Sequence, residues 1–198
     1  MKNTNKKDDL RVRRTYKLLF ESLLNLLSEK NFEDISVTDI CENAMVHRTT
    51  FYKHFEDKHQ LLKFCIKEFQ TMFSEQSIDE FKYGNLSDYY FNTIKNILEF
   101  TTSTKNKSHF VALLRNNSNS IQTIFHETVV EDVMLKLEEV KKSGTEILVP
   151  IQIIAEFYTG AIISVIRWWF ENDMPIPVEE IVKNTVIMSN NCKELIKK

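Results

Sequence analysis

Residues 36–55 have the sequence SVTDICENAMVHRTTFYKHF, which predicts two short helices joined by a tight turn. Ser36 followed three residues later by Asp39 is a capping-box pattern, so we expect the first helix to start here and to run to about Ala44. The second helix is expected at 48–54. Its outer side carries guanidinium, hydroxyl and amine groups, which suit phosphates and base edges. This layout is typical of a helix-turn-helix motif that reads DNA.

Further helices are predicted on both sides of the motif. Apolar residues recur at three- and four-residue steps over 11–30, which indicates a helix with one buried face, whereas residues 1–10 are polar and expected to be frayed. Asp57 followed by Gln60 marks the start of a helix expected to reach about residue 75. The first turns of the earlier helix carry four cations, Arg11, Arg13, Arg14 and Lys17. An isolated helix favours acidic residues there, so beside a helix-turn-helix motif we interpret the cations as a surface for nucleic acid.

Composition and charge extend this prediction to the whole chain. The 198 residues include only 3 Gly and 3 Pro, and because helix breakers are few we predict an all-α fold. The net charge is −2, but residues 1–67 hold 13 Lys or Arg against 10 Asp or Glu, whereas residues 68–198 hold 13 against 18. A basic front attached to an acidic body is expected when only one part meets nucleic acid. In the body, helices are predicted at 87–103, 107–115, 119–142, 146–172 and 177–196.

Cysteines and apolar segments bear on cellular location. Cys41, Cys65 and Cys192 are odd in number and far apart, which is typical of a reducing cytoplasm. The N-terminal segment has no apolar run, so we expect no secretory leader. The most apolar segment, 147–170, is interrupted by charged residues and is predicted to be a buried helix rather than a membrane span. We therefore expect a cytoplasmic protein.

These motifs resemble those of the tetracycline-repressor (TetR/AcrR) family of bacterial regulators. Over the first 65 or so residues, the resemblance rests on three groups of positions: Thr38, Ile40, Ala44 and Val46 in the core, FYKHF at 51–55, and KHQLL at 58–62. Near the C-terminus, YTGAIISVIRWWFEN at 158–172 and the P-x-P-x-E-E-I pattern at 175–181 are similar to the ligand domain of a subgroup that includes a dihydroxyacetone-kinase regulator.

The resemblance implies a three-helix helix-turn-helix DNA-binding domain at 1–57 and a larger helical domain for ligand binding and dimerisation at 58–198. The implied function is a sequence-specific homodimeric regulator, expected to be a repressor, that binds a palindromic operator and is released by a small molecule. The residues that would contact DNA are Thr38, His47, Arg48, Thr49, Thr50, Tyr52, Lys53, His54 and Lys58, with Thr38 and Lys58 on phosphates.

Two positions depart from the family pattern. Met45 stands where the turn usually has glycine, so a positive φ there would be strained. His47 stands where a small hydroxyl residue usually starts the recognition helix, and it is a weaker cap. Both departures leave the motif intact but bear on which bases it reads.

The body is predicted to supply a dimer surface and an effector pocket. Apolar stripes on the last two helices predict a four-helix bundle between two subunits, with interface residues Ile154, Tyr158, Ile162, Val165, Ile181, Val182, Val186 and Ser189. Candidate pocket residues are the aromatic side chains of Phe69, Phe73, Phe110 and Tyr158. A ligand that favours one conformation of the body would tilt the helix from Lys58 onward and change the spacing of the paired readers.

An enzyme and an adaptor protein are the alternatives to a DNA-binding regulator. An enzyme is not expected, because the glycine-rich phosphate loops, the G-x-S-x-G elbow and the H-E-x-x-H motif are absent from the sequence. His47, His54 and His59 with Cys41 match no zinc spacing, so neither a metal nor another cofactor is expected. The stronger alternative is an adaptor whose DNA reader is degenerate and which acts by binding a second regulatory protein.

Overall fold

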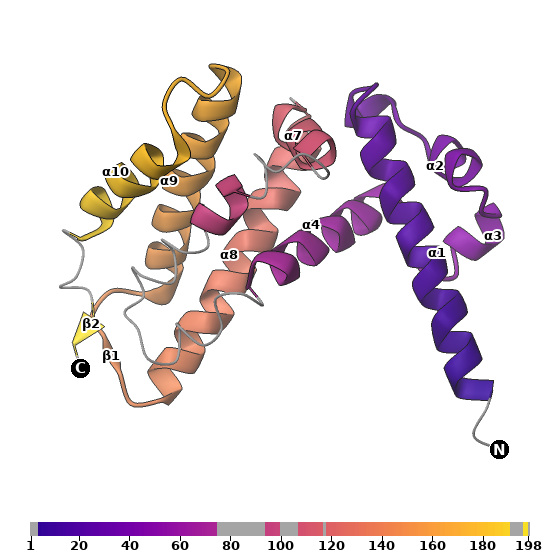
Figure 1. The fold of residues 1–198 in the computed structure, drawn as a ribbon. Helices are drawn as coiled ribbons and strands as arrows, with labels where there is room; N and C mark the ends of the chain where they lie inside the picture. The colour runs from indigo at the N-terminus through magenta and orange to yellow at the C-terminus, as the bar shows by residue number, and fades with distance from the viewer. Residues whose placement is uncertain (1–3, 75–93, 100–106, 117, 191–195, 198) are drawn as a thin grey trace. The chain divides into compact units, whose positions relative to one another are not determined.

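The computed structural model describes residues 4–74, 94–99, 107–116, 118–190 and 196–197. In these residues the all-α prediction is confirmed, apart from one pair of two-residue strands (Figure 1). The elements are α1 (Thr4–Leu27), the 3-10 helix η1 (Phe32–Asp34), α2 (Val37–Ala44), α3 (Arg48–Phe51), α4 (Lys58–Ser74), α7 (Lys107–Arg115), α8 (Asn119–Lys142), β1 (Glu146–Ile147), α9 (Ile151–Glu171), α10 (Val178–Asn190) and β2 (Ile196–Lys197). Residues 94–99 are the described part of the helix predicted at 87–103.

The chain divides into two compact units. The first unit consists of Met1–Cys65 and Ser108–Ile124, and the second of Ile66–Lys107 and Phe125–Lys198. This division differs from the predicted domain boundary after residue 57, because the first unit includes the start of α4, most of α7 and the first turn of α8. Helices α4 and α8 therefore each continue from one unit into the other.

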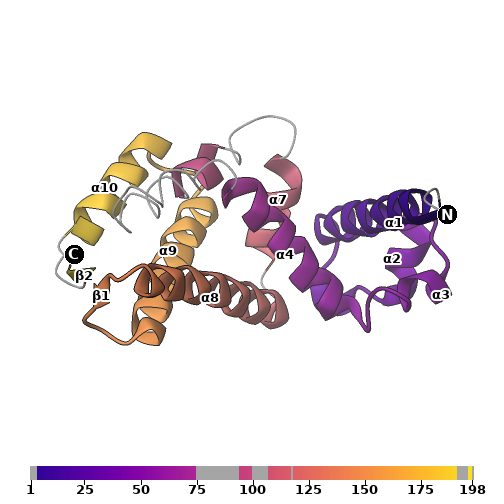
Figure 2. The same cartoon turned by 90° about the horizontal axis from the view of Figure 1, so that it is seen from below.

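The core of the first unit is built on the apolar face of α1. Helices α2 and α3 lie beside α1 (Figure 2). Leu19 and Leu23 of α1 are fully buried, as are Ile40 of α2, Phe51 of α3 and Leu61 of α4. Burying a side chain of this size contributes about 1.5–3 kcal/mol, so tertiary packing rather than intrinsic propensity holds these short helices together.

Capping residues set the starts of α2 and α4. Ser36 Oγ accepts a hydrogen bond from Asp39 N at 3.1 Å, and Asp39 Oδ2 accepts one from Ser36 N at 2.8 Å, which confirms the predicted capping box. Before α4, Gln60 N donates to Asp57 Oδ1 at 2.8 Å, and Gln60 Oε1 accepts from Glu56 N at 2.7 Å. The segment that contains α3 thus lies between two well-capped helices.

The core of the second unit joins α8 to α9. Val130, Val133 and Leu137 of α8 pack with Ile154 and Tyr158 of α9, and all five side chains are buried. These residues recur at three- and four-residue steps on each helix, so each helix contributes one continuous face to the contact.

The connection from α9 to α10 is a sharp one. The indole Nε1 of the buried Trp169 donates to the carbonyl oxygen of Ile176 at 2.7 Å. Within the connection, Asp173 and Met174 have positive φ values of 54° and 58°. These left-handed residues reverse the chain so that α10 can begin at Val178.

Helix α9 has one buried and one exposed apolar side. Ile154 and Tyr158 are buried, whereas Ile153, Phe157 and Trp168 are exposed. By length and composition alone this helix could cross a membrane, although a core helix of a soluble protein would pass the same test, and 39% of its apolar window is buried. The prediction of a buried helix is therefore confirmed for one side only.

Two predicted helices were too long where short strands form. β1 pairs with β2 in antiparallel fashion, with Ile147 opposite Ile196. Helix α9 begins at Ile151 rather than at 146, because Pro150 disfavours helical conformation in the residue before it. The prediction of helix up to residue 196 was also wrong, since Ile196 lies in the paired strand.

The predicted limits of α4, α7 and α8 agree closely with the structure, whereas those of the first helix do not. Helices α7 and α8 coincide with the predicted ranges 107–115 and 119–142, and α4 ends at Ser74. Helix α1 begins at Thr4 instead of 11. The segment predicted to be frayed contains neither glycine nor proline, and its lysines are good helix formers, so the helix extends through it.

Candidate nucleic-acid interface

The turn between α2 and α3 has the left-handed backbone that the sequence predicted. Met45, the C-cap of α2, has φ 52° and ψ 41°, a region that favours glycine over residues with a Cβ. Val46 N donates to Cys41 O at 2.9 Å and Met45 N to Glu42 O at 3.2 Å, and these bonds close the end of α2. The Met45 side chain is 94% exposed, so packing offsets little of the backbone strain.

The recognition helix is a single turn and is shorter than predicted. Helix α3 covers Arg48–Phe51, and residues 52–54 continue it as a turn, with His54 N donating to Phe51 O at 2.9 Å. His47 makes no side-chain capping bond, as expected from its departure from the family pattern. The β-branched Thr49 and Thr50 and the missing cap both disfavour a longer helix. Because helix propensity is weak here, the segment is held mainly by the buried side chain of Phe51.

Residues 47–54, which we call the recognition segment, expose one side to solvent. The exposed predicted contacts are His47, Arg48, Thr49, Tyr52 and Lys53, whereas Thr38, Thr50 and His54 are half-buried. A guanidinium such as that of Arg48 can donate two parallel hydrogen bonds to a guanine edge. Hydroxyl and ammonium groups such as those of Tyr52 and Lys53 suit phosphate oxygens.

A shallow depression joins the start of α3 to α2. It has a volume of about 290 Å³ and is lined by Thr38, Cys41, Glu42, Met45, Val46, His47 and Arg48. The structure thus brings three predicted DNA contacts, Thr38, His47 and Arg48, onto one surface. In helix-turn-helix proteins, one helix contacts the DNA backbone while the next presents its start to the base edges, and this surface fits that arrangement.

An aromatic cluster holds the end of the recognition segment against α1. The ring centroid of Tyr16 lies 5.1 Å from that of His54, 5.3 Å from that of Phe55 and 5.1 Å from that of Phe64. His54 meets Tyr16 edge-on, a favourable aromatic geometry. His54 therefore has a packing role, and its contact to DNA stays a prediction.

The Lys58 side chain hydrogen-bonds within the first unit. Its Nζ donates to the carbonyl oxygens of Phe32 at 2.8 Å, Glu33 at 3.0 Å and Ile35 at 2.8 Å. It also lies 4.7 Å from the centroid of the Phe32 ring. An ammonium group has three protons, so all three are used inside the first unit. In the free subunit Lys58 therefore joins the start of α4 to the η1 segment, and its contact to a phosphate stays a prediction.

A second set of hydrogen bonds ties η1 to the connection between α7 and α8. Asn116 Oδ1 accepts from Phe32 N at 3.4 Å, and its Nδ2 donates to Lys30 O at 3.1 Å. Glu33 Oε1 accepts from Ser118 Oγ at 2.7 Å. These bonds explain why the α7–α8 connection belongs to the first unit. No local pattern in the sequence predicts these bonds, because Glu33 and Ser118 are 85 positions apart.

The Glu33 carboxylate should make the stability of the first unit depend on pH. Hydrogen bonds from Ser118 and then from Ser120 lower the pKa of Glu33 from its ordinary value of 4.5. A carboxyl group whose pKa is lower in the folded state stabilises the fold above its unfolded pKa and loses this effect as the pH falls through its folded pKa. We expect the melting temperature of the wild type to exceed that of Glu33→Gln at neutral pH, with a gap that narrows as the pH falls below the ordinary carboxyl pKa of 4.5. Calorimetry between about pH 3 and 7 would measure it, and a constant gap would contradict the assignment.

Most of the predicted dimer residues face the interior of the second unit. Four of them are buried: Ile154, Tyr158, Ile181 and Val182. Ile162 packs against the α8–α9 core, and Val165 is half-buried. The side chains of Val186 and Ser189 lie outside the described part of the structure. The side chains of the four buried residues pack within one subunit, and their role in a dimer interface stays a prediction. The exposed apolar side of α9 includes the neighbouring positions Ile153 and Phe157.

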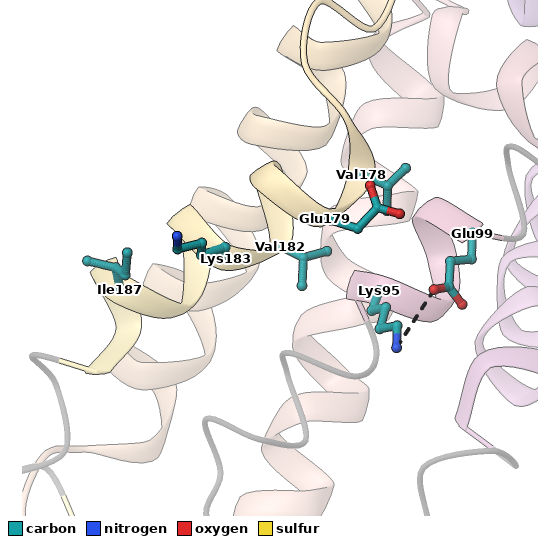
Figure 3. Close-up of a pocket in the computed structure, with 7 residues that line it drawn as sticks. All are labelled: Lys95, Glu99, Val178, Glu179, Val182, Lys183 and Ile187. Carbon is teal, nitrogen blue, oxygen red and sulfur yellow. Dashed lines mark ion pairs between the residues drawn. The ribbon is translucent and has the colours of Figure 1, made fainter.

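The structure describes the side chains of two of the four predicted effector residues, and their role in an effector pocket stays a prediction. Phe69 is buried, Tyr158 belongs to the α8–α9 core, and the side chains of Phe73 and Phe110 lie outside the described part. A largely apolar groove of about 370 Å³ lies elsewhere in the second unit, between residues 94–99 and α10 (Figure 3). It is lined by Lys95, Glu99, Val178, Glu179, Val182, Lys183 and Ile187, and the Lys95 and Glu99 side chains form an ion pair at 3.8 Å.

Two short helices around a tight turn, with a polar recognition segment on the second, define a protein of the helix-turn-helix class. A model of "Bacterial regulatory proteins, tetR family" matches residues 19–64, and a model of "Transcriptional regulator C-terminal region" matches residues 91–191. The chain belongs to the TetR family of bacterial transcriptional regulators, as its sequence motifs predicted.

Individual relatives show the same likeness. The TetC protein of transposon Tn10 from Escherichia coli is 35% identical over 68 residues, 34% of this chain and 34% of TetC. The dhaKLM operon transcriptional activator DhaS of Lactococcus lactis is 32% identical over 76 residues, 38% of this chain and 36% of DhaS. Each match spans about a third of the relative. The crystal structure of a TetR transcriptional regulator from Streptococcus agalactiae shares the fold, with a TM-score of 0.62, 22% identity, and coverage of 93% of this chain and 98% of that chain.

Proposed function

We propose that this chain is a homodimeric repressor in the cytoplasm that binds a palindromic operator through α3 and is released by a small molecule bound to its second unit. The observation that carries the proposal is the surface shared by α2 and α3, where Thr38, His47 and Arg48 surround one depression and Tyr52 and Lys53 are exposed. A helix of one turn reads few base pairs. Two copies about 34–36 Å apart, one turn of duplex DNA, would supply the missing affinity.

An exposed apolar stripe supports the assembly of two copies. Ile153, Phe157, Ala161, Ser164 and Trp168 are exposed on α9 and follow one another at steps of three or four residues, so they share one face. On α10, Ile187 and Met188 are also exposed, and Ile187 lines the groove between α10 and residues 94–99. Small residues in the middle of the stripe would let two helices approach closely. Contiguous exposed apolar surface of this kind marks interaction sites, and a two-fold dimer would cover the same stripe on both subunits.

The effector is proposed to act on the second unit. The apolar groove between residues 94–99 and α10 lies within the size range of small-molecule pockets, and Lys95 and Lys183 place cations on its rim (Figure 3). Helices α4 and α8 continue from this unit into the first, so a ligand that favours one conformation of the second unit could shift the reader through them. DhaS is named an activator, so for this chain the direction of regulation remains part of the proposal.

The test of DNA binding begins with duplexes selected by the wild-type protein from a randomised pool. Replacing Arg48 by alanine is expected to weaken binding by about tenfold or more and to relax the base preference at one position, because a bidentate contact discriminates by about 1–3 kcal/mol. Thr123→Ala is a matched control, since Thr123 is exposed on α8 in the same unit. Fluorescence anisotropy with matched and single-base-changed duplexes would measure both effects.

A second readout separates the proposal from an adaptor function. For a DNA reader, the logarithm of the affinity should fall with the logarithm of salt concentration at about 0.9 per phosphate contact. If wild type retains none of the pool at any salt concentration and instead purifies with a second regulatory protein, the adaptor alternative replaces the repressor.

A further inference from the structure

The side chain of Met45 contributes little to the fold that carries it. Its backbone lies in the left-handed region, at φ 52°, and its apolar side chain is 94% exposed. The hydrogen bonds that close α2 here come from the main chain of Met45 and Val46, so a glycine would form them equally well. Both the backbone conformation and the exposure disfavour methionine. A strained residue without an internal role points to a contact outside the subunit.

The position of Met45 indicates what that contact is. It lines the same depression as Thr38, His47 and Arg48, the residues through which the proposed function places DNA. Duplex DNA held by those three residues would lie over the depression and meet the exposed methionine. We propose that Met45 is a further DNA-contacting residue, which touches an apolar part of the duplex beside the bases read by α3. This inference rests on the proposed function.

The chemistry of methionine limits the part of DNA that it can recognise. Its side chain has no hydrogen-bond donor and only a weak acceptor, so it cannot pair with a phosphate or with the polar edge of a base. Its flexible and polarisable thioether suits apolar surfaces. In DNA these are the C5-methyl group of thymine and the face of deoxyribose. Glu42 lines the same depression, and its carboxylate disfavours a phosphate there while leaving an uncharged methyl or sugar acceptable.

The first arm of the test replaces Met45 by glycine. The change should raise the melting temperature, because glycine relieves the backbone strain, and should weaken binding to a duplex selected with wild type by about tenfold or more, because two readers each lose part of a buried methionine side chain. Met45→Leu keeps an apolar side chain and should bind like wild type. Met174→Gly is the matched control, because Met174 also has a positive φ but lies in the second unit. Met174 is half-buried, so this control tests affinity alone, and it should bind the duplex like wild type.

The second arm locates the contact on the DNA. Each thymine of the selected duplex is replaced in turn by deoxyuridine, which lacks only the methyl group. If one replacement weakens wild type but not Met45→Gly, the contact is to that methyl group. If no replacement matters and Met45→Gly still binds more weakly, the contact is to deoxyribose. If Met45→Gly and the wild type bind the duplex with equal affinity, the inference about Met45 is overturned and the proposed function is unaffected. The same result is expected if Met45 contacts a protein partner and not DNA. Failure of wild type to bind any duplex would overturn the proposed function as well.

Discussion

Replacing Lys58 by methionine is expected to destabilise the first unit while leaving the salt dependence of DNA binding unchanged. Methionine keeps much of the aliphatic stem but removes the ammonium group that donates to the carbonyls of Phe32, Glu33 and Ile35. The bonds to Phe32 and Ile35 are part-buried and the bond to Glu33 is exposed, so the free energy of unfolding should fall by about 2–3 kcal/mol, mostly from the first two. Chemical denaturation of the wild type and the variant would measure this change.

The salt dependence distinguishes this anchoring role from a phosphate contact. If Lys58 held a phosphate, its loss would reduce the slope of log affinity against log salt by about 0.9 per reader. Lys53→Met is the matched control, because Lys53 is exposed on the recognition segment and should lower the slope without lowering stability. If Lys58→Met keeps the stability of the wild type and reduces the slope, Lys58 contacts a phosphate and does not anchor α4.

Local sequence signals predicted the helix starts well. Ser36 with Asp39, and Asp57 with Gln60, fix the starts of α2 and α4 through hydrogen bonds that span three residues. Such short-range contacts can be predicted from the residue types at a fixed spacing. The positive φ of Met45 was predictable for the same reason, since the turn geometry depends on one position. The helix-turn-helix surface could therefore be outlined from residues 36–55 alone.

Contacts between distant segments could not be predicted in this way. A lysine that opens α4 looks the same in sequence whether its ammonium group meets a phosphate or three carbonyls, and Glu33 carries no mark of its partner Ser118. On α9 the difficulty is different. Apolar residues occur all around this helix, so periodicity cannot tell whether the side of Ile154 or that of Ile153 faces inward. The pairing of β1 with β2 is likewise a non-local contact between short segments.

Replacing Phe157 by glutamate is expected to convert the proposed dimer into monomers. Phe157 is 62% exposed near the middle of the apolar stripe on α9, so the added charge should leave the fold of the subunit intact. In a two-fold interface the same residue appears on both subunits, and two buried like charges would oppose association strongly. Analytical ultracentrifugation should show the mass halved. Affinity for a selected palindromic duplex should fall by about a hundredfold or more, because each monomer engages only one half-site.

Two variants show whether this effect belongs to the exposed stripe. Leu135→Glu places the same charge at an exposed apolar position of α8 and should leave the dimer intact. Ile154→Ala changes the buried side of α9, where only 2% of the side chain is exposed, and should lower the free energy of unfolding by about 2–5 kcal/mol without halving the mass. If Ile154→Ala dissociates the folded protein and Phe157→Glu does not, subunits associate through the side of α9 that the sequence first indicated. Because Ile154 and Phe157 lie three positions apart on one helix, one buried and the other exposed, the comparison distinguishes the buried side of α9 from its exposed side.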